Sequence, residues 1–160
     1  MGHKLITLIV YAEDEDDAVS RATYILEDMC SGRRIYNWYS LFTEESKNTT
    51  AGIGRWGKLP LVTPANSKIG KKLIDEGLDY TKKEIKESLS KLHEKIRDIK
   101  DEDIEKLIYK VLNEDDISYL YDNNGEAIIN EERLNKVLNK LDDSKYKDLK
   151  VYVVPADIHS

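Results

Sequence analysis

The residues best suited to chemistry in this sequence form the short motif Gly54-Arg55-Trp56-Gly57. An arginine between flexible glycines can present its planar guanidinium to a phosphate or carboxylate, while the adjacent indole stacks on a ring. The glycine spacing matches neither a dinucleotide-binding nor a Walker fingerprint. The alternative is a bulged strand in which Trp56 packs in the core and Arg55 pairs with an acidic helix. The burial tendency of tryptophan favours that alternative.

Asp157 and His159 form a second candidate pair, because residues two apart on an extended segment share a face. Such a pair can bind a metal, or act as an oriented histidine base beside a nucleophile. The chain has only two other histidines, His3 and His93, and it lacks HExxH, GxSxG and cysteine-cluster motifs. We therefore assign no metal and no cofactor. Because His159 is the penultimate residue, we favour a frayed terminus.

Two further polar features have simpler interpretations. Cys30 falls at the end of a predicted helix, where the negative end of the helix dipole raises the thiol pKa and disfavours a nucleophilic role. A single cysteine also indicates a reducing, cytoplasmic location. The acidic run 13–17 suits the first turn of a helix better than a cation site, which needs oxygen ligands from several directions.

The candidate ligand site lies in a basic, aromatic segment of an acidic protein. Residues 31–72 contain eight Lys/Arg and two Glu, a local charge of +6, which leaves 17 basic and 29 acidic residues, or −12, elsewhere. This asymmetry favours a local site for an anionic small molecule or protein partner over general nucleic-acid binding, although the segment would also suit packing against acidic helices of its own chain. The predicted ligand-binding residues are Arg55, Trp56, Trp38, Tyr39, Arg33, Arg34 and Lys58.

The elements that must position these residues follow from hydrophobic periodicity. Strands are predicted at 4–12, 35–42, 51–56, 117–121, 127–129 and 149–154. Helices are predicted at 18–29, 67–99, 101–112 and 130–141. This order predicts one α+β domain over 1–160 with a mixed, mostly antiparallel sheet. The predicted topology is a ferredoxin-like core with a long helical hairpin, 67–113, inserted; the hairpin either covers the sheet, which we favour, or protrudes.

Length and composition narrow the class of protein. A chain of 160 residues can bury a sizeable core, and no apolar run approaches the 18 residues of a membrane-spanning helix. The first apolar run lacks a cleavage site, which argues against a signal peptide. Abundant Lys, Glu and Ile without glutamine is typical of a thermophile, although an AT-rich genome would also favour Lys and Ile.

The order of these motifs resembles a small family of uncharacterised archaeal proteins. The likeness rests on the YNWY strand, on GRWG followed by LP and TP, and on the terminal VPADIH, and it covers nearly the whole chain. The first 60 residues are also similar to short uncharacterised proteins of phages and actinobacteria, which have Asp at position 37 and Gly at position 53 where this chain has Asn37 and Ile53. The resemblance implies a shared fold and no reaction. It singles out Trp38, Tyr39, Arg55, Trp56 and Asp157.

Three functions remain open at this point. We favour a non-enzymatic binding or regulatory domain that engages an anionic ligand or partner through residues 33–72. The second is a small hydrolase or metal-dependent enzyme that uses Asp157, His159 and Arg55, and it requires the C-terminal tail to lie beside the GRWG motif. The third is an oligomerisation module, such as a homodimer, formed through the helical hairpin.

Overall fold

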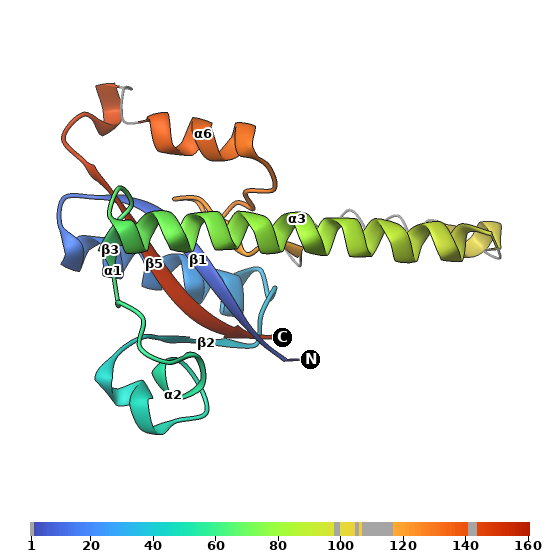
Figure 1. Ribbon diagram of the computed structural model, residues 1–160, viewed down its shortest axis with the longest axis horizontal. Coiled ribbons are helices and arrows are strands. Elements are labelled where there is room, and N and C mark those ends of the chain that lie inside the picture. Colours follow the sequence, from blue (N-terminus) through green and yellow to red (C-terminus); the bar gives the residue numbers. More distant parts are fainter. Residues whose placement is uncertain (1, 98–99, 105, 107–116, 141–143) are drawn as a thin grey trace.

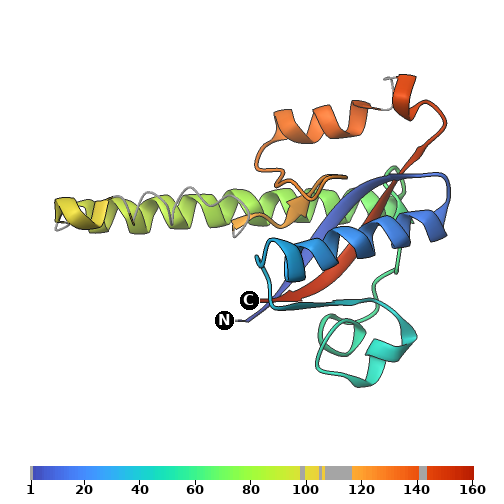
Figure 2. The ribbon, with the colours of Figure 1, turned by 180° about the vertical axis from the view of Figure 1, so that it is seen from behind.

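The computed structural model describes residues 2–97, 100–104, 106, 117–140 and 144–160. It is a mixed α+β arrangement with helices on both faces of an open sheet (Figures 1 and 2). The elements are β1 (His3–Ala12), α1 (Glu15–Glu27), a π-helical turn η1 (Asp28–Gly32), β2 (Trp38–Leu41), a 3-10 helix η2 (Glu44–Asn48), α2 (Ile53–Trp56), β3 (Thr63–Pro64), α3 (Lys68–Ile96), β4 (Leu120–Tyr121), α6 (Glu131–Asn139), a 3-10 helix η4 (Ser144–Tyr146) and β5 (Lys150–His159).

The first and last strands form the centre of the sheet. The described strands follow the order β2-β5-β1-β4, with β3 also paired to β5. β5 is antiparallel to β1 along its whole length and antiparallel to β2 and β3, whereas β1 and β4 are parallel. The mostly antiparallel α+β sheet is thus confirmed. The ferredoxin-like core predicted from the sequence is not confirmed by this order.

The two faces of the sheet bury different layers. The even-numbered residues of β1 and β5 pack against α1, where Ala22 and Leu26 are fully buried. The odd-numbered residues Ile9 and Val153 pack against α3 and α6. Because β1 and β5 are central strands with both faces covered, their near-continuous apolar sequences suit this position. Each buried aliphatic side chain stabilises the fold by about 1.5–3 kcal/mol.

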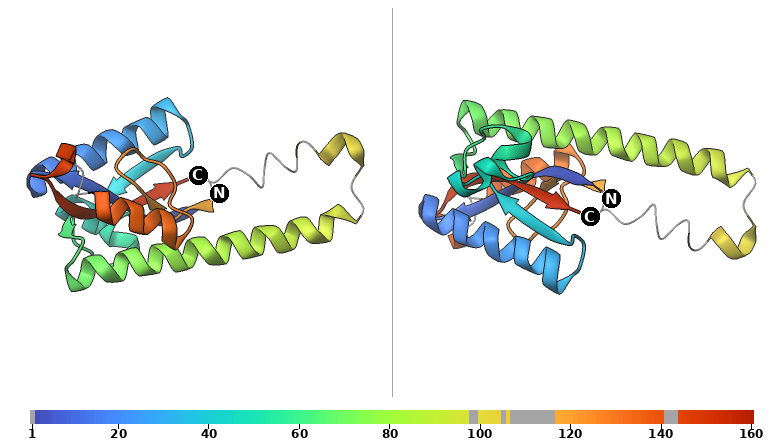
Figure 3. Two further views of the ribbon diagram at one scale, coloured as in Figure 1. Left: turned by 90° about the horizontal axis from the view of Figure 1, so that it is seen from above. Right: turned by 90° about the horizontal axis from the view of Figure 1, so that it is seen from below.

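The long helix α3 begins where the sequence predicts. The Ser67 hydroxyl accepts a hydrogen bond from the Gly70 N–H at 2.9 Å and caps the helix. The buried residues of α3 end at Thr81, and the rest of the helix projects past the sheet (Figure 3). Its first half therefore covers the sheet while its second half protrudes. Most of the second arm of the predicted hairpin lies outside the described residues, so the hairpin stays a prediction.

Three local predictions are corrected or sharpened. The predicted strand 51–56 is wrong, because Gly52 adopts φ +51° and the chain turns into the one-turn helix α2. The predicted strand 35–42 is shorter, and Tyr36 leaves it to pack in the core, where its hydroxyl meets that of Tyr121. The acidic run 13–17 is a helix start, as predicted, with Asp14 as the N-cap.

Candidate functional site

The candidate site is built around Asp157, a carboxylate with no exposed surface. Both of its oxygens lie near Nδ1 of His3, at 3.0 and 3.1 Å. An ionised carboxylate can only accept, so His3 Nδ1–H is the donor and Nε2 is left for another partner. An unpaired buried carboxylate would be strongly destabilising. The hydrogen bonds that Asp157 accepts, from His3 and from a second donor, are therefore essential to the fold here.

The second donor to Asp157 comes from the turn before α2. The backbone N–H of Gly52 donates to Asp157 Oδ2 at 2.9 Å in a buried hydrogen bond. Two features exclude a side chain at position 52. The φ angle is +51°, and a Cβ would lie 2.6 Å from the Ser46 hydroxyl oxygen. Glycine is therefore required for the chain to approach the strand. The hydrogen bond ties the segment with η2 and α2, which lies next to β2 in Figure 1, to the C-terminal half of β5.

Three rings cluster at the same end of the sheet as the carboxylate, and one of them, His3, contacts it. His3, Trp38 and His159 are register partners on β1, β2 and β5, so their side chains share one face. Trp38 and His159 are nearly parallel, with centroids 5.5 Å apart, and His3 stands edge-on to both at 5.1 Å. Trp38 remains 38% exposed, so this ring cluster has a solvent-accessible side.

One ring nitrogen in the cluster has no partner. Nδ1 of His159 is buried and makes no hydrogen bond with the residues that the structure describes. A buried polar atom without a partner costs about 1–3 kcal/mol, and natural folds carry few of them. Such local losses of stability are concentrated at functional sites, where residues are selected for contact with a ligand rather than for stability of the fold.

The motif Gly54-Arg55-Trp56-Gly57 lies on the segment that Gly52 anchors. Arg55 is exposed, and its Nε donates to the carbonyl oxygen of Thr50 at 2.8 Å. Trp56 is 39% exposed and Lys58 is exposed as well. The expectation that Trp56 packs in the core as part of a bulged strand is therefore wrong. Gly52, two residues before the motif, donates to Asp157 of the C-terminal strand. The enzyme hypothesis, which needs Arg55 together with Asp157 and His159, stays a prediction.

The other predicted ligand residues lie away from Asp157. Tyr39 points to the α1 face of the sheet, where burial, and then Glu27 and Cys30, raise the pKa of its phenol. Arg33 pairs with Asp28 at 2.8 Å and donates to the Gly125 carbonyl, near the end of α1. Arg34 is exposed, in a left-handed conformation with φ 56°. Residues 33–72 thus do not form one continuous site.

The structure also tests whether the basic segment is neutralised by its own chain. Within the described ranges, only Arg33 and Lys72 of its eight basic residues form ion pairs. Lys72 pairs with Glu76 one turn along the same helix, at 3.6 Å, so neither pair joins the segment to a distant acidic helix. The other cations of the segment form no ion pair with described residues and are free to meet an external anion.

The chemistry available at the site is that of imidazole, indole and carboxylate. In the part of the chain that the structure describes, no group of three or more His, Cys, Asp or Glu side chains is placed to hold a metal ion. Cys30 lies on the opposite face, and burial raises its thiol pKa. No described helix is long and apolar enough to cross a membrane.

Comparison with known proteins assigns a family. A family model described as a domain of unknown function (DUF7995) matches residues 2–160. The chain belongs to this family. No curated protein and no solved structure matches the chain significantly. The assignment confirms the expectation of a family without an established activity.

In this DUF7995 chain, sequence reasoning found Asp157 but assigned it the wrong partner. Asp157 and His159 share a face, as expected, yet the hydrogen-bonded histidine is His3, 154 residues away. The expectation of a frayed C-terminus is also wrong, because residues 150–159 form a central strand. The signal that could have found His3 is the pairing of the two long apolar strands, which aligns His3 with His159.

Proposed function

We propose that this domain binds an anionic ligand that carries a planar ring, at the end of the sheet where His3, Trp38 and His159 meet. The observation that carries the proposal is the hydrogen bond from Gly52 to Asp157. It ties the segment with Arg55 and Trp56 to the strand that holds the ring cluster. The function is one of binding, because the site offers a half-open aromatic surface and imidazole nitrogens, and the segment anchored by Gly52 carries exposed cations such as Arg55.

Each component has a separate role in this proposal. The ring of the ligand stacks on exposed indole surface, which contributes about 1–3 kcal/mol per base in nucleic-acid complexes. Arg55 supplies charge-assisted hydrogen bonds to the anionic group, since only its Nε is used within the described residues. His3 Nε2, oriented by Asp157, supplies a further polar contact. A nucleotide has the required combination of ring and anion.

Intrinsic tryptophan fluorescence gives a direct test, because Trp38 and Trp56 are the only tryptophans. We expect adenosine 5′-monophosphate to change the emission at lower concentration than adenosine or inorganic phosphate alone. Arg55→Ala should weaken binding by about tenfold, the value of one charge-assisted hydrogen bond. Arg34→Ala, an exposed arginine on another part of the molecule, is the matched control. If no anion binds wild type and Arg55→Ala markedly lowers the melting temperature, the segment is structural and the proposal fails.

A second candidate function, general acid–base catalysis, follows from the His3–Asp157 pair. A carboxylate that orients one imidazole nitrogen leaves the other free to take a proton from water. Neither His3 nor His159 is hydrogen-bonded to a serine, threonine or cysteine within the described residues, so the nucleophile would be water. Hydrolysis of p-nitrophenyl acetate and p-nitrophenyl phosphate should then fall sharply in His3→Gln but not in His93→Gln. Hydrolysis at the buffer rate by wild type would remove this candidate and leave the binding proposal intact.

A further inference from the structure

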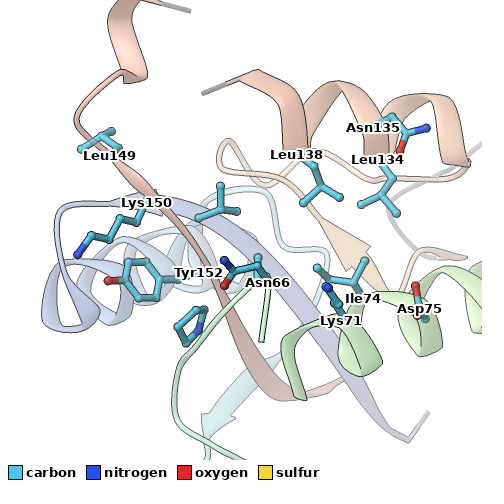
Figure 4. A pocket seen from close by; sticks show the side chains of 13 residues that line it. Asn66, Lys71, Ile74, Asp75, Leu134, Asn135, Leu138, Leu149, Lys150 and Tyr152 are labelled. Carbon is cyan, nitrogen blue, oxygen red and sulfur yellow. The ribbon is translucent and has the colours of Figure 1, made fainter. Parts of the chain in front are cut away.

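The sheet face that carries the ring cluster offers two different environments for a ligand. At the start of β5, a pocket of about 780 Å³ lies between α3 and α6 (Figure 4). Its lining includes the half-buried Leu138 and Val151 and contains no histidine or cysteine. Lys71 lies beside Asp75, and Lys150 lies at the opposite side, so the charged groups of the lining do not converge (Figure 4). The side chains that can bind a ligand through nitrogen lone pairs lie at the other end of β5.

At that end, two histidines lie opposite each other on the two central strands. His3 of β1 and His159 of β5 are register partners, so their side chains share one face. The His159 carbonyl accepts a hydrogen bond from the Asn37 N–H at 2.7 Å, so the backbone groups of His159 face β2 rather than β1. In such a non-hydrogen-bonded pair the Cα atoms are only about 4.5 Å apart and the side chains are closest. The two strands therefore hold the imidazoles side by side.

The separation of the two imidazole rings suits one shared metal ion. Their centroids are 5.1 Å apart and their planes are inclined by 76°. A Zn–N bond of about 2.0–2.1 Å places the ion about 3.2 Å from a ring centroid, so two imidazoles on one tetrahedral ion have centroids about 5 Å apart. Edge-to-face packing of rings gives similar separations. The hydrogen bonding of the ring nitrogens therefore decides between an ion site and simple packing.

His3 has the hydrogen bonding of a metal-binding histidine. The two oxygens of the buried Asp157 lie 3.0 and 3.1 Å from Nδ1, which fixes the proton there and leaves the lone pair of Nε2 free. Nε2 makes no hydrogen bond with the described residues and, unlike Nδ1 of His159, keeps accessible surface. Histidine ligands of metals usually donate their other N–H to a carboxylate or carbonyl, which orients the ring and makes the ligating nitrogen more basic.

His159 supplies a nitrogen that the fold leaves without a partner. Its Nδ1 is buried and makes no hydrogen bond with the described residues. The ring is held by β5 and by the nearly parallel indole of Trp38, whose centroid is 5.5 Å away. A bound ion would give this nitrogen a partner and remove the cost of leaving it unpaired.

We propose that Nε2 of His3 and Nδ1 of His159 bind one divalent transition-metal ion, such as Zn²⁺. Imidazole nitrogens favour ions of this class over Mg²⁺ and Ca²⁺, which take oxygen ligands. Within the described residues no group of three His, Cys, Asp or Glu side chains converges here, so water or an oxygen of the anionic ligand takes the remaining positions. The inference rests on the ring cluster of the proposed function and deepens it, because an ion with open positions also binds an anion.

Calorimetric titration of the full chain with Zn²⁺, without nucleotide, tests the inference, with Mg²⁺ as the control ion. We expect one Zn²⁺ site whose affinity falls at least tenfold in His159→Gln, since even the hydrogen-bond partners of metal ligands contribute about that much. This variant should fold, because the His159 side chain makes no hydrogen bond with the described residues. His93→Gln, which removes an exposed histidine of α3, should leave the affinity unchanged. In the wild type, Zn²⁺ should shift the ring ¹⁵N signals of His3 and His159 but not those of His93.

Equal Zn²⁺ affinities of wild type and His159→Gln would overturn the inference, as would unmoved ring signals of His3. Because the ion and the nucleotide are titrated separately, the two proposals fail separately. Binding of adenosine 5′-monophosphate by a chain that binds no Zn²⁺ would overturn the metal site and leave the proposed function intact. A Zn²⁺ site lost in His159→Gln, with no nucleotide bound in the presence or absence of Zn²⁺, would support the metal site and remove the proposed function.

Discussion

Odd-numbered residues at both ends of β5 point to the same face of the sheet, but the two ends are stabilised in different ways. At the N-terminal end, Val151 and Val153 contribute to an apolar cluster with α3 and α6. At the C-terminal end, the same alternation places Asp157 and His159 on that face. The apolar end leaves surface uncovered, whereas the polar end buries a carboxylate and supplies it with two donors from distant parts of the chain.

We interpret this difference as a sign that function, rather than stability, determines the residues of the polar end. An apolar residue at position 157 would continue the core without needing His3 or a turn glycine, and buried ion pairs often contribute less to stability than well-packed apolar groups. The fold instead keeps three groups close together: the buried Asp157, a His159 nitrogen without a partner among the described residues, and the exposed indole of Trp38. That combination is expected where a ligand, rather than stability, determines the residues.

The largest effect should come from removing the carboxylate. Asp157→Ala leaves the Gly52 N–H and His3 Nδ1 without an acceptor, and we expect it to lower the free energy of unfolding by about 3 kcal/mol. Urea unfolding at neutral pH measures this. Asp17→Ala, which breaks a half-exposed pair with Arg21 and a hydrogen bond from the Glu13 N–H, should cost about 1 kcal/mol. Equal losses in the two variants would erase the proposed contrast between buried and exposed carboxylates.

Adding a side chain at Gly52, where the turn approaches β5, should cause a smaller loss of stability. Gly52→Ala combines an unfavourable φ of +51° with overlap against Ser46, and we expect a cost of about 2 kcal/mol. Gly57→Ala is the control, because φ there is +80° but no atom lies within 4 Å of the added Cβ. Combining Gly52→Ala with Asp157→Ala should cost less than the sum, since both act on one hydrogen bond. Strict additivity would show that the turn is held by other contacts.

The smallest effect concerns the apolar end, where the hydroxyl of Tyr11 donates a hydrogen bond to the Val137 carbonyl of α6. Burial, and then Asp122 and Tyr146, raise the pKa of Tyr11 from 10.0 to about 12. The folded state therefore holds the phenol proton more tightly than the unfolded state. The resulting stability is fully present below pH 10 and is lost as the pH rises towards 12.

Tyr11→Phe should cost about 1 kcal/mol at pH 8, because the Val137 carbonyl loses its donor. It should also make the free energy of unfolding less sensitive to pH between 10 and 12. Urea unfolding of both proteins across this range is the measurement. Parallel pH dependences would show that Tyr11 does not govern the attachment of α6.

Much of the fold could be predicted from local patterns, and the candidate site could be predicted only in part. The capping residues Ser67 and Asn130 and the apolar strands follow from their own sequence neighbourhoods. The shared face of Asp157 and His159 does as well. The pairing of His3 with Asp157 depends on strand register across nearly the whole chain, which no local pattern contains.

The turn before α2 was mispredicted for a different physical reason. Glycines at 52, 54 and 57 are compatible with a bulged strand. The chain turns at Gly52 because two distant acceptors hold it there, Asp157 on β5 for the Gly52 N–H and the Ser46 hydroxyl for the Ile53 N–H. The turn at Gly52 also explains the exposure of Trp56. The turn starts α2, and this helix is too short to bury the indole. Residue type alone favours burial of tryptophan.

The most direct test of the central claim is a long-range ¹H–¹⁵N spectrum of the histidine and tryptophan rings, before and after addition of adenosine 5′-monophosphate. We predict that His3 carries its proton on Nδ1, and that the signals of His3, His159 and Trp38 shift as the nucleotide is added while that of His93 does not. A His3 ring protonated on Nε2 alone, with ring signals unmoved by the nucleotide, would contradict both the hydrogen bond and the site.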